Sequence, residues 1–140
     1  MRKVLILILL SVIISTKTLA QTLHIYGGSN HDVYLGCLNC SKYDQNSIWN
    51  SYGTYGSKYN SNSIWNKFGT YGSKYNTLSP WNSFSNNPPV IVDKDGEFYG
   101  YLTTNKYKSK RAEFGLAETI CEYHELISDD VSKWYDEIFK

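Results

Sequence analysis

The residues best suited to chemistry are three cysteines and a histidine. Cys37 and Cys40 have the C-x-x-C spacing, and Cys121 and His124 lie at positions i and i+3 of a predicted helix. These four have the ligand types of a tetrahedral zinc site, and C-x-x-C also occurs in redox sites. In an exported chain, however, thiols meet oxidising conditions. We therefore predict a structural disulfide, either Cys37–Cys40 or one of these two with Cys121, and no metal.

Signals for catalysis are weak. The sequence has neither G-x-S-x-G nor H-E-x-x-H. A small secreted hydrolase would have to use His124, or the three acids Asp93, Asp95 and Glu97. These acids lie in and beside a predicted hairpin turn, where Asp is expected because it caps turns. We predict no catalytic residue and no cofactor, and keep a hydrolase as an alternative.

A tandem repeat of 16 residues occupies positions 36–84 and carries most of the aromatic residues. Ser-Lys-Tyr begins at Ser41 and recurs at positions 57 and 73, and Ser-Ile-Trp-Asn begins at Ser47 and recurs at 63 and, as Ser-Pro-Trp-Asn, at 79. Rings beside amide, hydroxyl and ammonium groups can stack on sugars, and Tyr and Trp are enriched in protein interfaces. The candidate ligand-binding residues are Tyr55, Tyr71, Lys58, Lys74, Trp49, Trp65 and Trp81.

The repeat also predicts its own local structure. Pro80 replaces the isoleucine of the other copies, and proline suits the first position of a helix or the second of a turn. The preceding serines can cap such a turn, and Gly53 and Gly69 can end it in the left-handed conformation. We expect one short helical turn per unit, with its Trp packed inward against the Tyr of the next copy. The tyrosines and lysines named above belong to the loop half of the unit, where we expect exposure.

The flanking segments predict an α+β fold: two short β-hairpins flanking an aromatic repeat of short capped turns, with a C-terminal helical segment. Alternating apolar residues and turn signals mark the hairpins, and apolar residues at spacings of three and four mark the helices. Ser128 is the expected cap of a second short helix. The expected strands are 22–26 with 32–35, and 90–92 with 97–103 in a hairpin over 89–103; the helical segment is 113–139.

The first 20 residues have the pattern of a signal peptide. Arg2 and Lys3 precede the apolar run Val4–Ile14, and Thr18-Leu19-Ala20 offers small residues for cleavage. The run is short for a membrane span, although an uncut anchor is the alternative. Cleavage leaves one small domain, 21–140, located in the periplasm or outside the cell. We predict no membrane span after cleavage.

Charge argues against nucleic acid as the partner. The 14 basic residues less Arg2, Lys3 and Lys17 leave 11 against 13 acidic ones, a formal net charge of −2. The charge is unevenly distributed, because Gln45–Val92 contains no acid. The repeat therefore combines aromatic rings with lysines on a nearly neutral chain.

The Tyr-Gly-Ser-Lys-Tyr and Ser-Ile-Trp-Asn repeats, with Pro-Pro-Val-Ile-Val-Asp and Phe-Tyr-Gly-Tyr after them, resemble a group of uncharacterised exported bacterial proteins. The resemblance covers about residues 34–103 and implies a bacterial, exported protein, but no activity or ligand. We predict a non-catalytic binding or interaction module of the cell envelope, with a glycan or a protein as ligand. The alternatives are the hydrolase and a surface protein whose repeats only build the fold.

Overall fold

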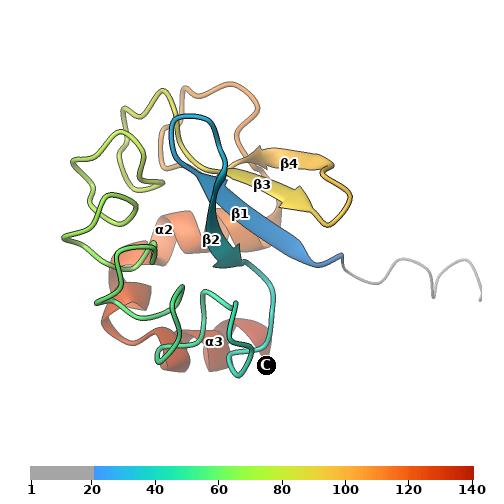
Figure 1. The fold of residues 1–140 in the computed structure, drawn as a ribbon, viewed down its shortest axis with the longest axis vertical. Helices are drawn as coiled ribbons and strands as arrows, with labels where there is room; N and C mark the ends of the chain where they lie inside the picture. The colour runs from blue at the N-terminus through green and yellow to red at the C-terminus, as the bar shows by residue number, and fades with distance from the viewer. Residues whose placement is uncertain (1–20) are drawn as a thin grey trace, which may run out of the picture.

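A four-stranded antiparallel sheet and two helices frame the repeat in the computed structural model, which describes residues 21–140 (Figure 1). The predicted signal peptide, 1–20, lies outside the described residues. The strand order is β2-β1-β3-β4, so both predicted hairpins form, and the predicted α+β class is confirmed. The elements are β1 (Leu23–Gly27), β2 (Val33–Cys37), β3 (Val90–Asp93), β4 (Phe98–Tyr101), α2 (Gly115–Asp129) and α3 (Val131–Phe139).

The two hairpins join through β1 and β3, the central strands. Leu23 lies opposite Asp93, and Tyr26 opposite Val90. Leu23 and Ile25 face the core, and the alternating residues His24 and Tyr26 are half-buried. Successive side chains of a strand point to opposite faces of the sheet, which accounts for this alternation. The whole repeat is thus inserted between β2 and β3, the two strands that flank β1 in the sheet.

The repeat is a chain of β-turns. Each unit has five corner residues whose backbone amides donate to carbonyls earlier in the chain. At four corners the carbonyl belongs to the residue three positions back, and at the fifth Ser57 N donates to Gly53 O, four positions back. Four steps of three and one of four account for the 16-residue period. The predicted helical turns are wrong, because a capping Ser and a following Pro suit β-turns equally well. The corners of one unit are Ser47, Asn50, Gly53, Ser57 and Asn60.

Two glycines of each full unit have different roles from those expected. Gly53 and Gly69 are absent from the residues with positive φ, so the predicted left-handed ends are wrong. Gly56 and Gly72 are instead required by space. A Cβ at Gly56 would overlap the carbonyl of Asn50, and one at Gly72 the carbonyl of Asn66.

Three buried tryptophans, Trp49, Trp65 and Trp81, form what we call the Trp ladder. The indole Nε1 of Trp65 donates to Ile48 O at 2.7 Å, and that of Trp81 donates to Ile64 O at 2.6 Å. Ring centroids follow one another at 5.9 and 5.6 Å. The inward Trp was predicted correctly, but each ring packs on the next Trp and not on a Tyr. Each rung is thereby tied to the one before it.

The C-terminal helices cover the ends of the Trp ladder. His124 on α2 stacks on Trp81, with centroids 4.4 Å apart and planes within 1°, and Phe139 on α3 meets Trp49 edge-on at 5.5 Å. Asp130, and not Ser128, caps α3 by accepting from the Lys133 amide. Ser128 is buried in the last turn of α2 and donates to Glu125 O.

A disulfide joins Cys37 and Cys40, with Cα atoms 5.6 Å apart, which confirms one of the two predicted pairings. Cys121 is a free, half-buried thiol whose Sγ donates to Thr103 O. Burial raises the pKa of Cys121 to about 11. Among residues 21–140, no cluster of His, Cys and acidic side chains could hold a metal ion. None of the helices in that range is long and apolar enough to cross a membrane.

Candidate functional site

The repeat presents six large rings to solvent. Each ring is the third residue of a turn whose first residue, Ser or Asn, accepts the ring residue's own amide. Ser57 Oγ accepts from Tyr59 N at 3.2 Å, and Asn66 Oδ1 accepts from Phe68 N at 3.1 Å. Such turns fix the backbone of the ring residue. The exposed fractions are 83%, 82% and 84% for Tyr43, Tyr59 and Tyr75, and 99%, 99% and 84% for Tyr52, Phe68 and Phe84.

A lysine directly precedes Tyr43, Tyr59 and Tyr75. Lys58 Nζ lies 5.6 Å from the Tyr59 ring centroid, and Lys74 Nζ lies 5.5 Å from that of Tyr75. Cation–π contact of this kind holds an ammonium beside a ring. We call Lys42-Tyr43, Lys58-Tyr59 and Lys74-Tyr75 the Lys–Tyr units. Each unit offers a ring face and a hydrogen-bond donor at the same place in the repeat.

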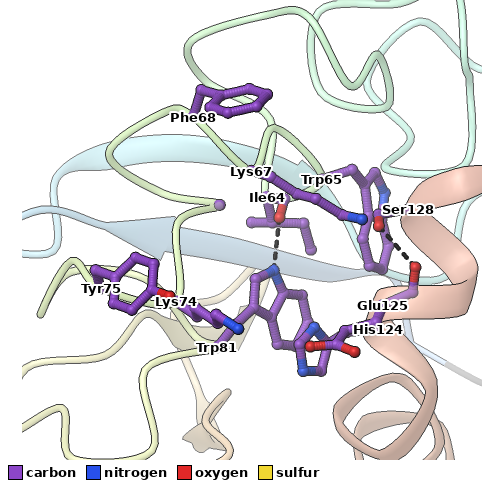
Figure 2. A pocket seen from close by; sticks show the side chains of 11 residues that line it. Ile64, Trp65, Lys67, Phe68, Lys74, Tyr75, Trp81, His124, Glu125 and Ser128 are labelled. Carbon is purple, nitrogen blue, oxygen red and sulfur yellow. Dashed lines mark hydrogen bonds between the residues drawn. The ribbon is translucent and has the colours of Figure 1, made fainter.

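A cleft lies where each Lys–Tyr unit faces the helices, and the walls of the first two clefts use equivalent residues. The third cleft is lined by Lys74, Tyr75 and Trp81 together with Trp65, Lys67 and Phe68 of the preceding copy. The first two clefts have volumes of about 280 and 500 Å³. Each is lined by the Lys, Tyr, Trp, Asn and outer ring of its own copy, and Ser132 or Ser128 closes the helical side. The third cleft, of about 340 Å³, is shown in Figure 2. The lining sets are Lys42, Tyr43, Trp49, Asn50 and Tyr52, then Lys58, Tyr59, Trp65, Asn66 and Phe68.

The third cleft has a floor of stacked rings. Figure 2 shows Trp81 with His124 against it, Lys74 beside Trp81, and Lys67 extending toward α2. Burial lowers the pKa of His124, and the charges of the two lysines lower it further, although Glu125 acts in the opposite direction. His124 is therefore a neutral stacking ring at neutral pH.

Ion pairs join the repeat to the helices beside the clefts. Lys42 binds Asp136 at 2.7 Å, and Lys67 binds Asp129 at 3.2 Å. The hydrogen bond from Lys42 to Asp136 raises the pKa of Lys42. These pairs connect the lysine-rich wall formed by the repeat to the acidic wall formed by the helices.

The sequence-predicted candidates fall into three groups. Lys58 and Lys74 are exposed and line clefts, as expected. The three tryptophans are buried, so they form the floors of the clefts and cannot be the contacting faces. Expected exposure is wrong for the remaining two. Tyr55 is half-buried, edge-on to Tyr34 at 5.0 Å, and Tyr71 is half-buried against the core.

The exposed rings were absent from the predicted site. Their signal in the sequence is a Ser or Asn two residues before each ring, as in Ser41-Lys42-Tyr43 and Asn66-Lys67-Phe68. In Gly53-Thr54-Tyr55 that position is a glycine, which has no side chain to cap the turn. The cap separates the outward rings from the half-buried tyrosines, but the buried tryptophans have it as well, since Trp49 N donates to Ser47 Oγ at 3.0 Å.

The acids considered for hydrolysis form a structural turn. Asp93 accepts from the amides of Asp95 and Glu97 at 2.9 and 3.0 Å, and from the Tyr99 hydroxyl at 3.1 Å. Burial acts to raise the pKa of Asp93, but these hydrogen bonds outweigh it and lower the pKa. A carboxylate held in this way is an acceptor that closes the β3–β4 turn.

Comparison with protein-family models, with curated proteins and with solved structures finds no match for this chain.

Proposed function

We propose that this protein is a non-catalytic module of the cell envelope that binds a polysaccharide strand along its Lys–Tyr units. The observation that carries the proposal is that the Lys–Tyr unit of each of the three copies lines a cleft beside the helices. Equivalent sites in a row suit a ligand whose own units are equivalent. A single small substrate would need only one of them.

The step between sites supports a polymer of sugars. Successive rings of the Trp ladder are 5.9 and 5.6 Å apart, which measures the advance per copy at the centre of the repeat. One sugar ring in an extended polysaccharide advances its chain by a similar length. The proposal places successive sugars of a strand at successive units along the repeat.

The chemistry of each unit supports the same ligand class. A Tyr ring that is more than four-fifths exposed can stack on the C–H face of a sugar while its hydroxyl stays in water. The Lys ammonium and the nearby Asn amide then donate to sugar hydroxyls. Because each contact is weak, affinity depends on several units engaging one strand at once.

Export gives such a module access to envelope glycans. The N-terminal segment has the signal-peptide pattern, and the Cys37–Cys40 disulfide is the bond expected of an oxidising compartment. The protein would then meet its ligand in the periplasm or outside the cell.

The test is retention of folded protein, residues 21–140, on insoluble cell-wall polysaccharide. We expect the unmodified protein to be retained and a triple variant, Tyr43→Ala, Tyr59→Ala and Tyr75→Ala, to wash through. Phe98→Ala is the matched control, because Phe98 is an exposed ring on β4. Equal retention of all three proteins, or of none, would contradict the proposal.

A protein partner is the second candidate, and the outer rings favour it. Phe68 and Phe84 lack a hydroxyl and are almost fully exposed, and exposed apolar rings of this kind often mark protein interfaces. Binding to whole cells that survives enzymatic removal of wall glycan, and is lost in Phe68→Ala, would favour this candidate over the first.

A further inference from the structure

The loop between β4 and α2 repeats the turn of the Lys–Tyr units outside the 16-residue repeat. Asn105 Oδ1 accepts from Tyr107 N at 3.0 Å, and Lys108 N bonds back to Asn105 O at 3.2 Å. The same two bonds close the turn at Lys58-Tyr59, where Ser57 stands in place of Asn105. Tyr107 is 94% exposed, and Lys106 precedes it as lysine precedes tyrosine in every unit.

The loop is docked on the end of the repeat by two backbone-directed bonds. Thr104 N donates to Pro80 O at 2.8 Å. In the Trp ladder, the carbonyls at the equivalent position, Ile48 O and Ile64 O, accept from indole Nε1 groups. Asn105 Nδ2 donates to Ser85 O at 2.9 Å, and both of these residues are buried. In Figure 1 this loop, coloured orange, lies beside the last turns of the repeat. It takes the place that a further copy would occupy.

The lysines of the units differ in what they bind. Within residues 21–140, Lys42 is held by Asp136, whereas no carboxylate lies within ion-pair distance of Lys58, Lys74 or Lys106. Three exposed ammonium groups therefore follow one another along the repeat and onto the loop. Segment 45–92 supplies no acid beside Lys58 and Lys74, whereas Lys106 lines a cleft that also contains Glu113, Glu118 and Glu122.

The acidic residues near the clefts belong to the helical wall. Asp129 and Asp136 are both paired with lysines of the repeat, and Glu125 lies beside His124 in the third cleft. An acidic ligand would be repelled from this wall and attracted to the outer lysines. The charge distribution thus favours a strand that lies over the exposed tyrosines, with its acidic groups directed toward the lysines.

We propose that Lys106-Tyr107 is a fourth Lys–Tyr unit and that the strand bound along the four units is an acidic polysaccharide. This inference rests on the proposed function, and it adds both a residue pair and a ligand class. The lysines supply the charge recognition, and the rings supply the recognition of the sugar faces.

The experiment titrates the folded protein with oligogalacturonates of two to six sugars and with their methyl esters, which have the same chain without the charge. We expect affinity for the acids to rise up to four sugars, and the esters to bind about tenfold more weakly. Tyr107→Ala and Lys106→Met should each lower affinity for the tetramer about fivefold or more, and leave affinity for the dimer within twofold. Both side chains are exposed, so neither change threatens the fold.

Lys94→Met is the matched control, since Lys94 is an exposed lysine in the β3–β4 turn. Tetramer affinity that is unchanged in both loop variants, or lowered equally by the control, would overturn the fourth unit. Equal affinity for acids and esters would overturn the acidic ligand class while leaving glycan binding intact. Failure of the unmodified protein to bind either series and to be retained on cell-wall polysaccharide would contradict the proposed function as well.

Discussion

Replacing the central tryptophan, Trp65→Phe, tests whether the Trp ladder holds the repeat together. Trp65 is buried between the other two indoles, and its Nε1 donates to Ile48 O at 2.7 Å. Phenylalanine keeps a ring but removes the donor. The buried carbonyl left without it costs about 1–3 kcal/mol. The smaller ring loses contacts and leaves space worth about 1 kcal/mol more.

We therefore expect Trp65→Phe to lower the free energy of unfolding by about 3 kcal/mol, which is a large fraction of the 5–15 kcal/mol typical of a domain. Urea unfolding followed by circular dichroism measures this as a shift of the midpoint at constant m-value. Trp134→Phe is the control, because Trp134 is half-buried on α3 and stacks on Tyr123 outside the ladder. A loss below 1 kcal/mol, or one no larger than the control's, would refute the role assigned to the ladder.

Three further predictions concern other parts of the fold. Gly72→Ala should lower the free energy of unfolding, measured by thermal unfolding, by about 2 kcal/mol or more, because the new Cβ would overlap the Asn66 carbonyl. The control Gly115→Ala, at the start of α2, meets no atom within 4 Å and should be neutral or stabilising. Equal effects of the two substitutions would contradict the close approach at Gly72. Replacing Cys37 and Cys40 by serine should lower the free energy of unfolding by about 2 kcal/mol, since the loop that the disulfide closes is short. Thiol titration of the unfolded, unreduced protein should find only Cys121. Three titratable thiols would contradict the disulfide. Burial lowers the pKa of His124, so the fold is most stable while His124 is neutral, above the ordinary histidine pKa. The free energy of unfolding should therefore fall as pH drops from about 6.5 toward the lowered pKa. His124→Phe should remove part of this pH dependence, and an unchanged pH profile in that variant would contradict the role of His124.

The sequence predicted what depends on near neighbours. Both hairpins and the two helices follow from local periodicity, and the buried tryptophans follow from their regular spacing among polar residues. The turns of the repeat were misassigned because serine and proline occupy similar places at the start of a helix and in a β-turn. Only the carbonyl partners, such as Asp44 O for Ser47 N, distinguish the two.

What depends on distant contacts could not be predicted. The pairing of β1 with β3 requires the repeat to return the chain to its start, so no local pattern shows it. The half-buried state of Tyr55 depends on Tyr34 of β2, and the fourth unit at Tyr107 depends on Thr104 reaching Pro80 O. The exposed tyrosines share a Ser or Asn cap two residues earlier, but so do the buried tryptophans, so the cap alone does not identify an exposed ring.

The most direct test of the central claim is a solution NMR titration of the folded protein with solubilised cell-wall polysaccharide, observing the tyrosine ring protons. We predict that the resonances of Tyr43, Tyr59 and Tyr75 shift together and saturate at one ligand concentration, while those of Tyr99 on β4 stay in place. Shifts confined to a single unit, shifts centred on the sheet, or no shift at any ring would contradict it.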